Sequence, residues 1–146
     1  MKKHVQMICI LLSVCMIFAF PVSADSEPQT WASLYFSIHD CYLYKVDSST
    51  FEIWYDVTAT ATIMQELGVS SIEVERSADG ENWSIMRTYD AEDYPEMIRE
   101  NAGTHEGYIT YRYATPGYYY RAYITFYAKN SSGIGERGRY TAVLHM

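Results

Sequence analysis

The segment Phe51–Thr62 constrains the fold most strongly, because its side chains alternate with a period of two. Apolar or aromatic side chains fill every second position, and polar side chains or tryptophan fill the positions between; the first set is Phe51, Ile53, Tyr55, Val57, Ala59 and Ala61. This alternation is typical of a β-strand with one buried face. A slip of one residue would expose the whole apolar set, so we expect a single register.

Short strand patterns separated by turn residues continue along the chain. We predict strands over 34–46 (one or two, with a break near His39-Asp40), 71–76, 83–89, 108–113, 118–129 and 140–144. Turn clusters lie between them, including Asp79-Gly80 and Pro116-Gly117, which suit tight turns. Residues 63–68 predict a single helical turn ending at Gly68, and Asp90–Glu106 reads as a long acidic loop. The pattern favours an all-β fold, an antiparallel β-sandwich of about seven strands.

The N-terminus has the order of a secretory signal peptide. Lys2 and Lys3 precede an apolar stretch, Val5–Phe20, which ends near Val22-Ser23-Ala24. The stretch is shorter than the roughly 20 residues of a spanning helix, and bulky Val14 before Cys15 disfavours a lipoprotein site. We therefore expect a signal peptide over 1–24, a short polar leader over 25–30, one domain over 31–146 and a secreted, extracellular protein.

The charge of the chain argues against nucleic-acid partners. The 146 residues carry a net charge of −7, with 18 Asp and Glu. Removing the two lysines of the signal leaves nine Lys and Arg, so the mature chain would carry −9. Phosphate backbones repel such a chain. We expect no cofactor and a monomer.

Two segments resemble fibronectin type III domains, which belong to the immunoglobulin-like β-sandwiches. Ile72–Trp83 contains Ser-x-Asp-Gly-x-x-Trp, as in the middle hairpin of that family. Pro116–Gly135 resembles the last hairpin, with a Pro-Gly turn, a tyrosine strand and an Ala-x-Asn-x-x-Gly-x-Gly turn. The corner tyrosine of the family is Tyr120 when counted from Pro-Gly, whereas counting back from the Ala-x-Asn turn reaches Ala122.

Other features depart from that family or extend the resemblance. Trp54 lies on the face opposite Ile53 and Tyr55, whereas the family's early tryptophan shares the core face. The whole chain is also similar to an uncharacterised family of small secreted proteins of Gram-positive bacteria. That resemblance implies export and no particular activity.

The tyrosines suggest a binding surface. All fifteen follow the predicted signal. On 118–129, alternation places one set on the outer face of the sheet, Tyr119, Arg121, Tyr123 and Tyr127. Exposed tyrosines with an arginine suit a protein or glycan ligand, and a cross-strand ladder that only stabilises the sheet is the alternative. We predict a non-enzymatic interaction domain that binds an extracellular protein or glycan through this face.

Two alternatives use the few reactive side chains. A small metal-dependent hydrolase would need His39, His105 and the acidic loop, but the sequence lacks a complete ligand set for zinc or the calcium spacing. We therefore predict no metal site and no catalytic residues. Cys41 is the single cysteine after the signal. We expect a buried free thiol, with dimerisation through Cys41 as the alternative.

Overall fold

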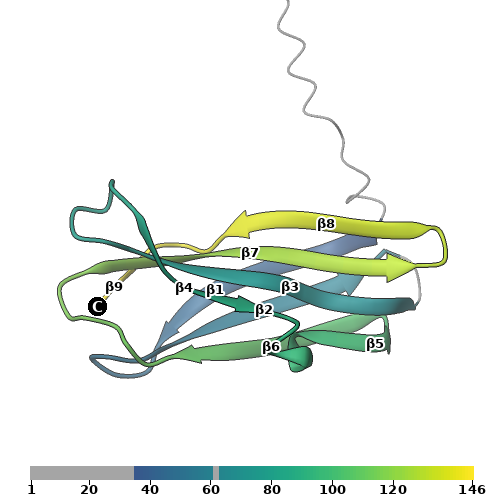
Figure 1. Ribbon diagram of the computed structural model, residues 1–146, viewed down its shortest axis with the longest axis horizontal. Coiled ribbons are helices and arrows are strands. Elements are labelled where there is room, and N and C mark those ends of the chain that lie inside the picture. The colour runs from purple at the N-terminus through teal and green to yellow at the C-terminus, as the bar shows by residue number, and fades with distance from the viewer. Residues whose placement is uncertain (1–34, 61–62) are drawn as a thin grey trace, which may run out of the picture.

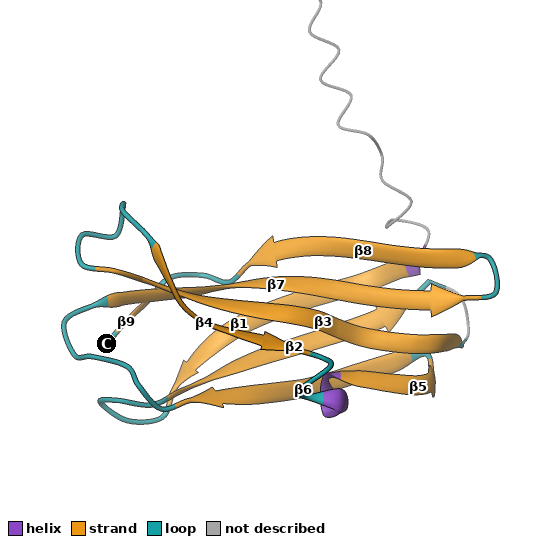
Figure 2. Cartoon of the chain, in the orientation of Figure 1, coloured by secondary structure: helices purple, strands orange, loops and turns teal. Residues whose placement is uncertain are grey.

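Two antiparallel sheets form a β-sandwich in the computed structural model, which describes residues 35–60 and 63–146 (Figure 1; Figure 2). One sheet has the strand order β1-β2-β6. Its strands are β1 (Phe36–Lys45), β2 (Phe51–Ala59) and β6 (Thr104–Tyr111). The predicted all-β antiparallel sandwich is therefore confirmed.

The facing sheet has the order β4-β3-β7-β8, with β5 added to β3 and β9 added to β7. Its strands are β3 (Met64–Ser77), β4 (Ser84–Asp90), β5 (Ile98–Ala102), β7 (Tyr119–Asn130), β8 (Gly133–Tyr140) and β9 (Leu144–His145). A short 3-10 helix, η1 (Pro95–Met97), precedes β5. No helix in the described part of the chain is long and apolar enough to cross a membrane.

The core lies between the sheets and follows the predicted alternation. On β2, Phe51, Ile53 and Val57 have no exposed surface. On β7 every second side chain is fully buried, namely Tyr120, Ala122, Ile124, Phe126 and Ala128. Because β7 pairs with β3 on one side and β8 on the other, its inner face sits at the centre of the sheet. The side chains predicted to face the core on these two strands are therefore confirmed where the structure describes them.

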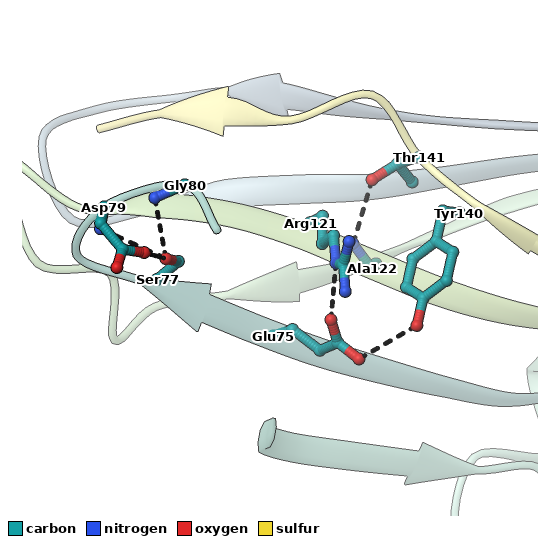
Figure 3. A network of polar contacts seen from close by, with 8 residues as sticks. All are labelled: Glu75, Ser77, Asp79, Gly80, Arg121, Ala122, Tyr140 and Thr141. Carbon is teal, nitrogen blue, oxygen red and sulfur yellow. Dashed lines mark hydrogen bonds and ion pairs between the residues drawn. The ribbon is translucent and has the colours of Figure 1, made fainter. Parts of the chain in front are cut away.

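Two predicted turns are confirmed with their polar contacts. The β3–β4 hairpin turns through Gly80, whose φ of 79° favours glycine. A carboxylate oxygen of Asp79 accepts hydrogen bonds from the backbone N–H groups of Glu81 and Asn82. The Ser77 hydroxyl donates to the same carboxylate (Figure 3). Gly117, with φ of 85°, turns the chain into β7. The Tyr120 hydroxyl accepts a 2.8 Å hydrogen bond from the backbone N–H of Thr115. This bond ties the start of β7 to the residues before the turn.

Two predictions for local structure in β1 and β3 are wrong. Strand β1 runs through His39-Asp40 without a break, because each residue pairs with β2. Residues 64–68 continue β3 and form no helical turn, since β5 and β7 pair with them on both sides. Gly68 is required there by packing, because a Cβ would overlap the carbonyl oxygen of Met97.

The predicted acidic loop and the last strand also differ. Asp90–Glu106 includes η1, β5 and the start of β6, so only a short connection after Asp90 is irregular. Strand β8, with its three glycines, lies between the predicted strands over 118–129 and 140–144, where the sequence predicts no strand. The predicted strand over 140–144 is replaced by the end of β8 and the short β9. The predicted signal peptide and leader lie outside the described residues.

Tyrosine rings cover glycines on neighbouring strands. A Cβ on Gly138 would fall within the phenol of Tyr123, and one on Gly107 would fall within that of Tyr55. Gly135 is covered in the same way by Tyr35. Each ring fills the space that the glycine leaves and stabilises a strand whose own residue contributes no side chain. These contacts explain how a glycine-rich segment such as β8 joins the sheet.

Candidate binding site

A pocket of about 300 Å³ lies where the end strands of the two sheets face each other. The end strands are β4 and β6. Residues at the start of η1 line one part of the pocket, and Arg112-Tyr113 after β6 line another. We call this the Arg87 pocket; its aromatic and cationic residues are Arg87, Tyr89, Tyr94, Tyr108, Arg112 and Tyr113.

The pairing of β4 explains why Arg87 points into the pocket. Arg87 lies opposite Val74 and Tyr89 lies opposite Ile72 on β3. Val74 and Ile72 face the core, and cross-strand partners share a face. Arg87 and Tyr89 therefore project from the end strand toward the opposing sheet. An inward-pointing charge on an end strand also discourages pairing with another chain.

The pocket walls are phenol rings with different exposure. Tyr89 is buried and contacts Tyr94 edge to face, with ring centroids 5.2 Å apart. Burial raises the pKa of Tyr89, although the positive charge of Arg87 opposes this effect. Tyr108 and Tyr113 are the open part of the wall, with exposed fractions of 49% and 68%. The lining of the pocket therefore combines one buried ring, Tyr89, with two exposed rings, Tyr108 and Tyr113.

Arg87 is held by aromatic groups and not by a carboxylate. Its Nη2 donates to the Tyr94 hydroxyl at 3.3 Å, and its guanidinium carbon lies 4.8 Å from the Tyr89 ring centroid and 5.9 Å from that of Tyr113. The Tyr94 contact raises the pKa of Arg87, whose guanidinium is charged in proteins in any case. Neither Arg87 nor Arg112 forms an ion pair with another described residue. The pocket therefore presents two cationic groups that are not in an ion pair with a described residue, and Glu96 is the one carboxylate among its lining residues.

The outer face of β7 contains the binding residues that the sequence predicts. Tyr119, Arg121, Tyr123 and Tyr127 do lie on one face, and all four are half-buried. Arg121 donates to Glu75 at 2.6 Å, and Tyr140 donates to the other carboxylate oxygen at 3.3 Å (Figure 3). The Arg121 guanidinium also lies 4.2 Å from the ring centroids of both Trp83 and Tyr140. We call these four residues, Arg121, Glu75, Trp83 and Tyr140, the Arg121 cluster.

The other polar groups on this face also have partners within the sheet. The Tyr127 hydroxyl and the Lys129 ammonium both donate to Glu66, at 3.0 and 2.7 Å. The Tyr123 ring covers Gly138 and contacts Tyr140 at 4.7 Å. Tyr119 packs against His145 at 4.6 Å. The face therefore resembles a cross-strand network more than an open binding surface.

The reactive residues proposed for a hydrolase are separated. His39 and His105 lie on outer strands β1 and β6, with Val57 of β2 between them in register. His105 contacts the Glu96 carbonyl oxygen, while His39 packs on Phe126. Burial lowers the pKa of both imidazoles. Among the residues described, no group of three or more His, Cys, Asp or Glu is placed to hold a metal ion.

Cys41 lies on the inner face of β1, opposite Tyr55. Its side chain is buried, with 7% of the residue exposed. Burial raises the pKa of the thiol to about 11, so the neutral form predominates at neutral pH. Dimerisation through Cys41 would require the thiol to leave the core.

An aromatic ladder on the outer face of β1-β2-β6 was missed by sequence reasoning. Trp54 stacks on Tyr108 with ring centroids 4.7 Å apart, and Tyr42 stacks on the other side at 6.2 Å. The alternation of β2 predicts that Trp54 points outward, but it does not predict that Tyr42 and Tyr108 lie beside it. Tyr108 belongs to both the ladder and the Arg87 pocket.

Comparisons with known proteins give little beyond these observations. No protein-family model and no curated protein matches the chain. Among solved structures, the chain is similar to the sporulation control protein Spo0M from Bacillus subtilis, at 9% sequence identity and a TM-score of 0.41. The match covers 70% of this chain and 47% of that structure, so the chain spans about half its length. A likeness this weak does not bear on function.

Proposed function

We propose that this chain is a secreted, non-enzymatic binding protein whose ligand occupies the Arg87 pocket. The observation that carries the proposal is the cationic charge of Arg87 and Arg112 in a pocket walled by tyrosines, without an ion-pair partner among the described residues. Concave sites with aromatic walls and a few polar groups are the usual form of ligand sites. Sequence reasoning placed the site on β7, and we move it to the β4–β6 side.

We further propose that the sandwich is of the fibronectin type III kind. Strand β4 lies beside β3, whereas the fourth strand of a constant-type immunoglobulin domain joins the sheet of its first two strands. The Tyr120 hydroxyl bonds to the backbone five residues upstream, near the start of β7, as a tyrosine corner does. Both features support a relationship to fibronectin type III domains. In such a domain the sandwich would hold in place the loops and end strands that bind a ligand.

The test is a binding screen with purified protein on two arrays, one of saccharides and one of peptides. We expect a ligand from one array to bind the parent chain and the β7-face variant Tyr119→Ser/Tyr123→Ser/Tyr127→Ser, but not the pocket variant Arg87→Gln/Arg112→Gln. Circular dichroism would establish that each variant is folded. Loss of binding in the β7-face variant alone would return the site to β7, and a ligand that tolerates both sets of changes would overturn the pocket.

A further inference from the structure

The charges around the Arg87 pocket differ in sign from those of the chain as a whole. The chain has 18 acidic residues against 11 basic ones. Among the lining residues the order is reversed, because Arg87 and Arg112 face a single carboxylate, that of Glu96. A concave site with an excess of cationic charge raises the local concentration of anions. This balance of charge favours a ligand with at least one negative charge.

The geometry of Arg87 suits a planar anion. A guanidinium offers five N–H donors, and Tyr94 is the hydrogen-bond partner of one of them. Contact with the Tyr89 and Tyr113 rings limits the motion of the side chain, so less entropy is lost when a ligand binds. A carboxylate can accept two parallel hydrogen bonds from such a group. The structure thus provides an oriented receptor for a carboxylate.

The rest of the pocket favours a sugar ring over an acidic peptide. Tyr113 presents an exposed ring, against which the C–H face of a pyranose can pack, whereas the Tyr108 ring is already stacked on Trp54. The phenol groups of Tyr94, Tyr108 and Tyr113 and the Thr110 hydroxyl can exchange hydrogen bonds with sugar hydroxyls. Glu96 can accept from a hydroxyl but would repel a second carboxylate. A volume of about 300 Å³ is at the small end of ligand sites, which suits one or two sugar rings.

We infer that the Arg87 pocket binds a pyranose that carries one carboxylate, such as a uronic acid within a glycan chain. This inference rests on the proposed function and specifies its ligand. Arg87 would bind the carboxylate, Arg112 would add long-range attraction, and Tyr113 would pack against the ring.

The test compares two ligands that differ only in charge. An oligogalacturonide and the same oligosaccharide with its carboxyl groups reduced to alcohols would be titrated into the full chain by calorimetry. We expect the acidic form to bind at least about tenfold more tightly, as hydrogen bonds to charged groups allow. We also expect its affinity to fall as sodium chloride rises. A glucuronate-containing chain and a sulfated neutral chain serve as further acidic probes.

Variants then assign the selectivity to Arg87. In Arg87→Gln the acidic and reduced forms should bind within about twofold of each other. In Tyr113→Ala both should weaken by a similar factor, since ring packing does not depend on charge. Arg137→Gln, an exposed arginine on β8, is the charge-matched control and should retain the selectivity.

Several results would overturn the inference. Equal binding of the acidic and reduced forms would do so, as would unchanged selectivity in Arg87→Gln. The inference would also fail if the sulfated chain bound more tightly than any carboxylated one, or if no saccharide bound. If acidic peptides bind instead, and Arg87→Gln abolishes that binding, the ligand class is wrong while the pocket stands. If Arg87→Gln only makes the chain self-associate, both this inference and the proposed function fail, and Arg87 protects the strand edge.

Discussion

Arg121 and Arg87 are both surrounded by aromatic rings, yet their environments differ in one decisive respect. Arg121 lies between Trp83 and Tyr140 and is paired with Glu75, which is only 8% exposed. Arg87 lies against Tyr89 and Tyr113 with the Tyr94 hydroxyl as its polar partner. The first group is neutralised within the sheet, and the second is not.

In our proposal, this difference separates a structural role for Arg121 from a binding role for Arg87. A half-buried charge is stable when an opposite charge and hydrogen bonds compensate its desolvation. The Arg121 cluster meets that condition with its own residues. The Arg87 pocket remains open to solvent and can exchange water for a ligand anion. We therefore expect changes in the two regions to affect different measurements.

The largest effect on stability should come from Arg121→Gln. The substitution leaves Glu75 without its cation and removes a group packed between two rings. Breaking a buried pair typically costs 3–5 kcal/mol, and because Arg121 is partly exposed we expect about 2–3 kcal/mol. Urea unfolding would measure the change, with Arg137→Gln as the control. A loss below about 0.5 kcal/mol would show that the Arg121 cluster does not stabilise the sheet.

Gly138→Ala should destabilise the same face through packing. The added Cβ would fall within the Tyr123 phenol, so that ring must move from its place beside Tyr140. Inserting one carbon into a packed contact costs about 1–3 kcal/mol. In a Tyr123→Ala background the same change should cost much less, because the two sites are coupled. Equal costs in both backgrounds would contradict the proposed contact.

Alkaline pH should destabilise the core by a smaller amount. Burial raises the pKa of Tyr55 to about 12. An unfolded tyrosine ionises near 10, so the native state holds the proton more tightly and stability falls as pH rises above 10. For this residue alone we expect a loss of about 1 kcal/mol between pH 9 and pH 11. Urea unfolding at both values would measure it, and Tyr55→Phe should reduce the difference.

Tyr94→Phe should have the smallest effect. It removes the hydroxyl that orients Arg87 and leaves the ring in place, so we expect unfolding to change by less than about 0.5 kcal/mol. Affinity for a carboxylated saccharide should fall by about threefold, because Arg87 must be ordered on binding. A calorimetric titration measures the change. Unchanged affinity would mean that Tyr94 does not position Arg87.

Sequence reasoning predicted the parts of the fold where each strand has one strongly apolar face. The side chains of β2 and β7 that face the core could be predicted, because the inner positions of both strands are apolar without interruption. Strand β8 was missed, since its glycines and charges resemble a turn. Its glycines are covered by the rings of Tyr123 on β7 and of Tyr35, which lies just before β1. The start of β3 was misread because Met64-Gln65-Glu66-Leu67 favours a helix, and pairing on both sides overrides that preference.

The Arg87 pocket could not be predicted from the sequence. Its residues come from β4, the connection to η1, and β6 with the residues after it, and they meet only when the two end strands face each other. The sequence prediction used the same residue types, tyrosines with an arginine, and placed them on β7, where they alternate along one strand. Which arginine has a carboxylate partner depends on Glu75, 46 positions away from Arg121.

The most direct test of the account measures stability and binding together in two single variants, Arg87→Gln and Arg121→Gln. Each would be unfolded in urea and titrated with an oligogalacturonide and its reduced form. The account predicts that Arg121→Gln loses about 2–3 kcal/mol of stability and keeps its preference for the acidic form, while Arg87→Gln keeps its stability and loses that preference. The reverse pattern, or the loss of selectivity in Arg121→Gln alone, would contradict it.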